Sequence, residues 1–321
     1  MRKPASLKFV FALAALTILP ATIALANKGA SPARYCRFQA GERIAYGVVE
    51  GERVRELSGD LFGSPQRTDR TYALQEVKLL VPVQPTQVVA LAGNYRSHLG
   101  QDHVTTTITT TTTVVTDRET GETSAQSQTT SETRSADQVP ARFQIVQPFF
   151  KTPACLVAHE GEIVLPADAG PVHYEAELVI VIGKTARNVS KDRALEFVFG
   201  VTCGNDVSAR AWQKNDVQWW RAKGSDTFGP CGPFIATGLD YDDLLMQLRL
   251  NGDVRQKERT SEMIHDVATT VSVISQQVTL NPGDLIFTGT PGETAEMNPG
   301  DVVEVELEGV GVLRNRVVAG K

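Results

Sequence analysis

The stretch His173-Tyr174-Glu175-Ala176-Glu177-Leu178-Val179-Ile180-Val181-Ile182 places two carboxylates directly before five large apolar residues. The short apolar run, rich in β-branched residues, predicts a buried strand. Alternate side chains of a strand share a face, so Glu175 and Glu177 point the same way. Two carboxylates this close repel each other unless water or a cation neutralises them. The stretch therefore predicts either a solvated strand end or a site for a hard divalent cation, with Mg²⁺ as the first choice.

A further carboxylate ends the next predicted strand. The apolar run from Phe199 leads into Asn205 and Asp206, and Arg210 and Gln213 follow within a few residues. An Asp at a strand exit is often a turn or helix-cap residue. Beside a Glu-x-Glu strand it becomes a candidate third ligand, and three carboxylates on one Mg²⁺ leave positions for water and substrate.

The rest of the chain predicts an α+β fold that is mainly β. Short apolar runs separated by Gly and Pro predict strands at 162–166, 199–202, 244–251, 284–288 and 302–307, and residues 43–57 predict a hairpin that turns at 50–52. The best helix candidates are short and lie at 193–197 and 261–276, and a turn or short helix is expected at 95–101. No G-x-G-x-x-G motif follows a strand, which disfavours a Rossmann fold and favours a β-rich roll or sandwich.

Four segments are expected along the chain. Residues 1–26 combine basic residues, a short apolar run and the small-residue end Ala24-Leu25-Ala26, which is typical of a secretory signal peptide. The mature protein is then expected to be exported, periplasmic or secreted, with no membrane attachment, although a retained anchor is the alternative. A small β-rich segment follows at 27–92. Residues 93–146 contain a polar turn and a Thr-rich insert, and residues 147–321 form the main domain.

The insert at 104–138 is dominated by Thr, Ser, Glu, Asp and Gln. Few large apolar residues could anchor it, so we expect a solvated loop or linker. A mobile cover over a site is the functional alternative. Its β-branched residues could also pair as an exposed ribbon.

Composition excludes several classes of protein. With 41% apolar and 21% charged residues the chain is globular. Its net charge of −5 and its lack of a basic cluster disfavour a nucleic-acid-binding protein, because phosphate contacts need many Lys and Arg side chains. The four cysteines form no C-x-x-C pair, which excludes a zinc knuckle. Their wide spacing favours buried free thiols over disulfides.

Five motifs occur in a fixed order, and together they carry a family resemblance. They are Tyr174–Gly183, Asn205–Arg210 with Gln213, Lys223–Asp226, Pro282–Asp284 and Thr288–Pro291. This series resembles the fumarylacetoacetate hydrolase family over residues 147–318. The segment Ala90–His98 also looks like the active-site turn of that family. The resemblance implies a mixed β-sandwich roll, usually a homodimer.

The resemblance also implies roles for individual residues. The metal ligands would be Glu175, Glu177 and Asp206, binding Mg²⁺, with Mn²⁺ or Ca²⁺ as alternatives. His98 would move protons and Lys223 would face the substrate's oxygens. The substrate-binding residues would be Tyr95, Arg210, Gln213 and Thr290. One departure concerns His98: many members place a glutamate three residues later, where this chain has Gln101. Gln can orient an imidazole but cannot oppose its positive charge.

The implied activity is Mg²⁺-dependent hydrolysis of a carbon–carbon bond in a short 1,3-diketo acid of the acylpyruvate or fumarylacetoacetate type, through an enolate that the metal stabilises. The first alternative is a decarboxylase or isomerase of a related oxo-dioate, such as oxaloacetate or 2-hydroxyhepta-2,4-diene-1,7-dioate. These reactions need no attacking water and would tolerate Gln101 better. The second alternative, from a different class, is an exported binding protein without catalysis.

Overall fold

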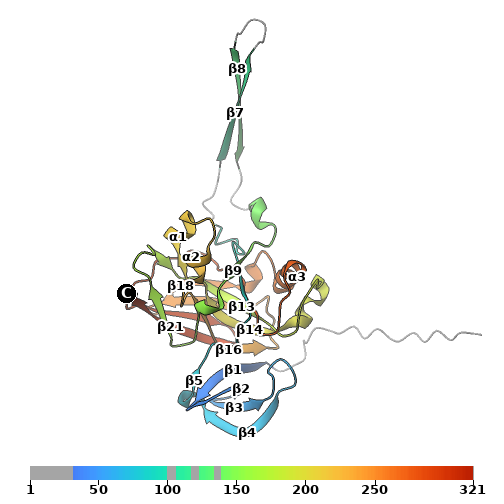
Figure 1. The fold of residues 1–321 in the computed structure, drawn as a ribbon, viewed down its shortest axis with the longest axis vertical. Helices are drawn as coiled ribbons and strands as arrows, with labels where there is room; N and C mark the ends of the chain where they lie inside the picture. The colour runs from blue at the N-terminus through green and yellow to red at the C-terminus, as the bar shows by residue number, and fades with distance from the viewer. Residues whose placement is uncertain (1–31, 100–105, 117–122, 134–138, 321) are drawn as a thin grey trace, which may run out of the picture.

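The computed structural model describes residues 32–99, 106–116, 123–133 and 139–320 (Figure 1). The expected signal peptide at 1–26 and the residues Gln101 and Asp102 lie outside these ranges. Within the described part of the chain, no helix has the length and hydropathy needed to cross a membrane.

A mixed sheet of twelve strands forms the centre of the molecule. Ten of its strands follow one another in the order β4 (Gln66–Ala73), β3 (Arg53–Ser58), β2 (Arg43–Glu50), β1 (Ala33–Ala40), β16 (Gly229–Thr237), β14 (Val198–Asn205), β13 (Ala176–Ile182), β19 (Leu285–Phe287), β6 (Val88–Leu91) and β9 (Pro148–Lys151). The short strands β5 (Lys78–Leu79) and β10 (Leu156–Val157) pair with β1 and β16.

The predicted strand after the two glutamates is β13, and all seven of its residues are buried. It runs antiparallel to both of its neighbours, β14 and β19. Leu178, Ile180 and Ile182 belong to the largest apolar cluster, whereas Val179 and Val181 belong to a second cluster on the opposite face. A strand covered on both faces reads as a continuous apolar run, which explains why β13 lacks polar alternation.

A second sheet covers one face of the central strands. Its order is β11 (Glu162–Leu165), β21 (Gly311–Ala319), β20 (Val302–Leu307), β17 (Leu245–Leu250) and β18 (Asp253–Arg259). In β17 and β20 every second residue is buried, as expected where one face packs on a core and the other meets water. Met246, Leu248 and Val305 share the largest cluster with β13. The expected mainly β sandwich is therefore confirmed.

The N-terminal strands form an extension of the central sheet (Figure 1). Strands β1 to β4 pair in sequence order, and β1 joins them to β16. The predicted hairpin at 43–57 is confirmed as β2 and β3, which pair up to Glu50 and Arg53 around Gly51, whose φ is +62°. Strand β6, which belongs to the same predicted 27–92 segment, lies instead between β19 and β9.

The Thr-rich insert contains two paired strands in place of the expected irregular loop. Strands β7 (Thr106–Thr116) and β8 (Thr123–Thr133) pair in register over eleven residues each and stand off the body (Figure 1). Thr110 and Thr112 bond across the ribbon to Thr129 and Ser127. The structure therefore agrees with the alternative of an exposed ribbon, in which β-branched residues pair as strands without a packed core beneath them.

Helices are few and short. The longest helix among the described residues is α3 (Val267–Gln277), which is capped by the Asp266 side chain and begins later than the predicted 261–276. The predicted helix at 193–197 is a 3-10 helix at Lys191–Phe197, η4. Two helices were not predicted, α1 (Arg210–Asn215) and α2 (Trp220–Gly224). The remaining elements are β12 (Val172–His173), β15 (Ser208–Ala209), η1 (Leu74–Glu76), η2 (Ala141–Phe143), η3 (Pro153–Cys155) and η5 (Thr260–Glu262). All four cysteines are buried and free, as predicted.

Candidate metal-dependent active site

Three carboxylates meet where β13 begins and β14 ends. Glu175, Glu177 and Asp206 each offer an oxygen within 4.8 Å of the others. Antiparallel pairing opposes Ala176 to Asn205, so the residues flanking that pair share one end of the sheet. The backbone N–H of Asp206 donates to the carbonyl of Glu175 at 2.8 Å, which fixes the two segments side by side. The predicted cluster is thus built by strand register.

Glu177 has an unsatisfied oxygen. Its side chain is fully buried, and Oε2 accepts the backbone N–H of Gly289 at 2.7 Å. Oε1 is buried without a hydrogen-bond partner among the described residues. Burial, followed by the charges of Asp206 and Glu175, raises the pKa of Glu177 well above its usual value. An orphaned carboxylate oxygen beside two other carboxylates fits the all-oxygen donor set of a hard divalent cation.

Lys223 bridges the other two carboxylates. Its Nζ donates to Glu175 at 2.8 Å and to Asp206 at 2.6 Å. Burial opposes its charge, but the two carboxylates outweigh burial and raise the pKa of Lys223. Burial likewise opposes the charge of Glu175, but Lys223, Arg210 and His98 outweigh it and lower its pKa to about 2. Both groups are therefore held in their charged forms.

Lys151, at the end of β9, is a member of the site that sequence reasoning missed. Its side chain is fully buried, and Nζ donates to Asp206 at 2.6 Å and to the carbonyls of Phe228 and Lys223. The only signal in the sequence was a lysine directly after two apolar residues, Phe149 and Phe150. A buried lysine requires a partner charge, which Asp206 supplies.

Arg210 and Gln213, which the resemblance predicts to line the site, lie together, and Arg210 contacts Glu175. Arg210 Nη2 lies 2.7 Å from Glu175 Oε1 and 2.6 Å from the hydroxyl of Thr294, while Nη1 donates to Gln213 at 2.7 Å. About a quarter of the Arg210 side chain is exposed, so its guanidinium can meet an incoming anion.

His98 is half-buried, and the positive charge of its ring is one of the influences that lower the pKa of Glu175. Its Nδ1 lies 2.7 Å from the carbonyl oxygen of Gly292. A carbonyl only accepts hydrogen bonds, so Nδ1 carries the proton and Nε2 keeps its lone pair when the ring is neutral.

Two further predicted residues are buried. Thr290 accepts a hydrogen bond from Gln256 Nε2 at 3.0 Å. Tyr95 packs in the largest apolar cluster, and its hydroxyl has no hydrogen-bond partner within the described ranges. Burial, followed by the charge of Glu177, raises the Tyr95 pKa. Gly289 of the same turn as Thr290 has φ +95°, and a Cβ there would lie 2.9 Å from Asn94, so the turn requires glycine.

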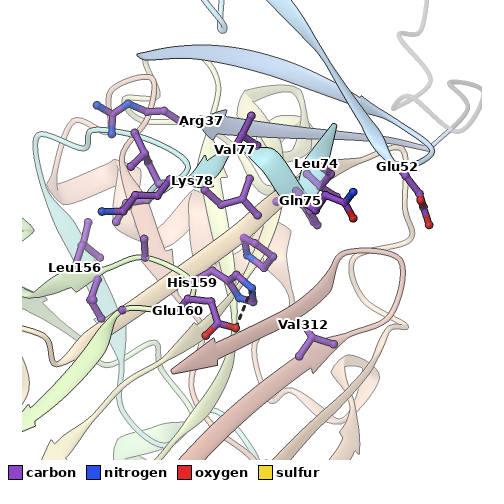
Figure 2. A pocket seen from close by; sticks show the side chains of 18 residues that line it. Arg37, Glu52, Leu74, Gln75, Val77, Lys78, Leu156, His159, Glu160 and Val312 are labelled. Atoms are coloured by element: carbon purple, nitrogen blue, oxygen red, sulfur yellow. Dashed lines mark ion pairs between the residues drawn. The ribbon is translucent and has the colours of Figure 1, made fainter. Parts of the chain in front are cut away.

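A separate cavity of about 970 Å³ lies between the N-terminal strands and the C-terminal body (Figure 2). Arg37 and Lys78 lie toward one end and Glu52 toward the other (Figure 2). Its lining includes none of the predicted site residues. This cavity is therefore distinct from the carboxylate cluster.

Comparison with protein families agrees with the site. Residues 112–318 match the family model described as fumarylacetoacetate (FAA) hydrolase C-terminal, and residues 33–82 match the model described as Rv2993c-like, N-terminal. The chain belongs to the fumarylacetoacetate hydrolase family.

Relatives within the fumarylacetoacetate hydrolase family cover nearly the whole chain. Protein Rv2993c of Mycobacterium tuberculosis is 37% identical over 89% of this chain and 98% of its own length. The crystal structure of 2-hydroxyhepta-2,4-diene-1,7-dioate isomerase from Mycobacterium marinum is 37% identical, covers 90% of this chain and 100% of its own, and has a TM-score of 0.72. Maleylpyruvate hydrolase from Sphingobium, solved with manganese(II) and pyruvate, is 26% identical with the same coverage and a TM-score of 0.66.

Proposed function

We propose that this protein is a divalent-metal-dependent hydrolase that cleaves a carbon–carbon bond in a short 1,3-diketo acid of the acylpyruvate type. The observation that carries the proposal is the Oε1 of Glu177, which has no partner among the described residues and lies within the carboxylate cluster; the His98 imidazole keeps a lone pair on Nε2 that can accept a proton. Mg²⁺ is the proposed metal, with Mn²⁺ or Ca²⁺ as alternatives; Mn²⁺ is bound in the maleylpyruvate hydrolase relative.

The cation would be held by Glu175, Glu177 and Asp206. When bound, it supplies positive charge that polarises the substrate's carbonyl group and favours the enolate. Lys151 and Lys223 orient Asp206 from two sides, which fixes this ligand before any metal arrives.

The remaining chemistry follows from side chains of the chain itself. His98 Nε2 removes a proton from water, and the hydroxide adds to the distal carbonyl carbon. The carbon–carbon bond then breaks, its electron pair stays on the pyruvate fragment as an enolate, and the imidazolium returns the proton to carbon. Acetylpyruvate and water would give acetate and pyruvate. The positive charges of Arg210 and Lys223 stabilise the enolate and the carboxylate of the departing fragment.

Isomerisation or decarboxylation of a related oxo-dioate is the second candidate. The observation that favours it is the 37% identity to the M. marinum isomerase over 90% of this chain. These reactions use the same enolate without an attacking water. His98 would then carry the proton between two carbon atoms, or protonate the enolate left after CO₂ departs.

The experiment compares acetylpyruvate, oxaloacetate and 2-hydroxyhepta-2,4-diene-1,7-dioate as substrates, with Mg²⁺ and with EDTA. We expect metal-dependent acetate and pyruvate, with kcat at least about 100-fold lower in His98→Gln. CO₂ or an isomer as the product would move the assignment to the second candidate. Saturable metal and oxalate binding without turnover would instead support an exported binding protein.

A further inference from the structure

We propose that Glu258, acting through Ser97, is a positioning residue that holds His98 in the tautomer required of a base; this rests on the proposed function. Glu258 lies in the second sheet, on β18, and the motifs of the sequence do not include it. Its Oε2 accepts the hydroxyl of Ser97 at 2.6 Å. Ser97 Oγ in turn accepts the backbone N–H of Gly292 at 2.9 Å.

The chain of bonds ends at the imidazole. The carbonyl of Gly292 accepts His98 Nδ1–H at 2.7 Å, while the N–H of the same glycine donates to Ser97. Both polar groups of Gly292 are thus fixed by neighbours in one turn, Ser97 and His98. A hydroxyl has one hydrogen, and its donation to Glu258 leaves the lone pairs of Ser97 for the Gly292 N–H. Without an acceptor at Glu258 the hydroxyl can rotate, and the carbonyl that fixes the tautomer loses its support.

The strand that carries Glu258 also fixes the neighbouring loop. Gln256 lies two residues earlier and so on the same face of β18. Its Nε2 donates to Thr290 and to the carbonyl of Pro291, and its Oε1 accepts the N–H of Ala176 between the two glutamates. Side chains on one face of β18 therefore contact three parts of the site. Glu258 contacts the turn that carries His98, and Gln256 contacts both the turn at Thr290 and the start of β13. This shared anchor explains why Glu258 can affect His98 without touching it.

The test uses four variants in the full chain: Glu258→Ala, Glu258→Gln, Ser97→Ala and, as a matched control, Glu262→Ala. Glu262 is an exposed glutamate four residues further on, with the same charge. We expect kcat to fall about tenfold in Glu258→Ala and Ser97→Ala with KM within twofold. Glu258→Gln keeps an acceptor oxygen and recovers most of kcat, and Glu262→Ala matches the wild type. Thermal melting identifies any variant that fails to fold.

The second readout does not depend on turnover. Nitrogen-15 NMR of histidine-labelled protein, with the His98 signal assigned from His98→Gln, reports which ring nitrogen carries the proton. We expect Nδ1–H in the wild type and in Glu258→Gln, and a mixture with Nε2–H in Glu258→Ala and Ser97→Ala. An unchanged tautomer in Glu258→Ala overturns the inference even if kcat falls. A changed tautomer supports it even if no substrate is turned over, which would count against the proposed function alone.

Discussion

Glu56 and Glu177 are both almost completely buried, and their surroundings differ in one respect. Glu56, in the N-terminal strands, accepts five hydrogen bonds, from Arg43, Arg70 and Tyr72, so both of its oxygens are saturated. Glu177 accepts one, and its other oxygen has no partner within the described chain. The pKa of Glu56 falls to about 2, mainly through Arg70 and Arg43, whereas that of Glu177 rises.

The difference separates a structural carboxylate from a functional one. Burial of a charge costs free energy unless partners replace its water. At Glu56 the protein supplies those partners itself, and the carboxylate joins three strands. At Glu177 one carboxylate oxygen has no partner among the described residues, so the free-energy cost of its burial is not offset. Such a cost, beside two further carboxylates, is typical of a ligand-binding site.

The largest expected effect comes from Glu177→Gln. Gln can still accept the Gly289 N–H, but its neutral amide cannot replace a charged ligand oxygen. We expect kcat/KM to fall at least about 100-fold, and Mn²⁺ binding by calorimetry to weaken in parallel. The melting temperature without metal should equal or exceed that of the wild type, because a buried carboxyl group with a raised pKa, which costs folding free energy, is replaced by a neutral amide. Retained turnover would contradict the assignment of Glu177 as a ligand.

Glu56→Gln should show the opposite pattern. The side chain of Glu56 is 1% exposed, but its arginine partners are about half exposed, so water screens the ion pairs. We expect the free energy of unfolding to fall by about 1–2 kcal/mol, with kcat unchanged. Urea unfolding measures this change. The control is Glu50→Gln, which breaks the more exposed pair with Arg55 and should cost less than about 0.5 kcal/mol. A loss of kcat in Glu56→Gln would show that the N-terminal strands and the active site are coupled.

The smallest effect is a dependence on pH. Because the pKa of Glu56 is about 2 in the folded state and 4.5 for an ordinary glutamate, its contribution to stability is complete above pH 4.5. It is lost progressively as the pH falls from 4.5 toward 2. The difference in unfolding free energy between wild type and Glu56→Gln should therefore be largest at neutral pH and shrink by pH 3. If the difference in unfolding free energy stays constant between pH 7 and pH 3, it comes from packing and not from the charge of Glu56.

Sequence reasoning succeeded where the controlling geometry is local. The alternation of a strand placed Glu175 and Glu177 on one face, and the end of the next strand placed Asp206 nearby. It failed for Lys151 and Glu258, because their partners lie 55 and 161 residues away and only the folded sheets bring them together. For the insert, the polar composition favoured a solvated loop, and the pairing of β7 with β8 was expected only as an alternative from the β-branched residues.

The β7–β8 hairpin also sets how the molecule moves and collides in solution. A strand of eleven residues extends roughly 36 Å at about 3.3 Å per residue, whereas a body of about 250 residues has a radius of gyration near 18 Å, which corresponds to a sphere about 46 Å across. The hairpin therefore reaches about three quarters of the width of the body. It stands off the body in Figure 1. The hairpin makes the molecule more elongated and slows its end-over-end rotation in solution. Each of its two strands has an unpaired backbone edge that is exposed to other molecules.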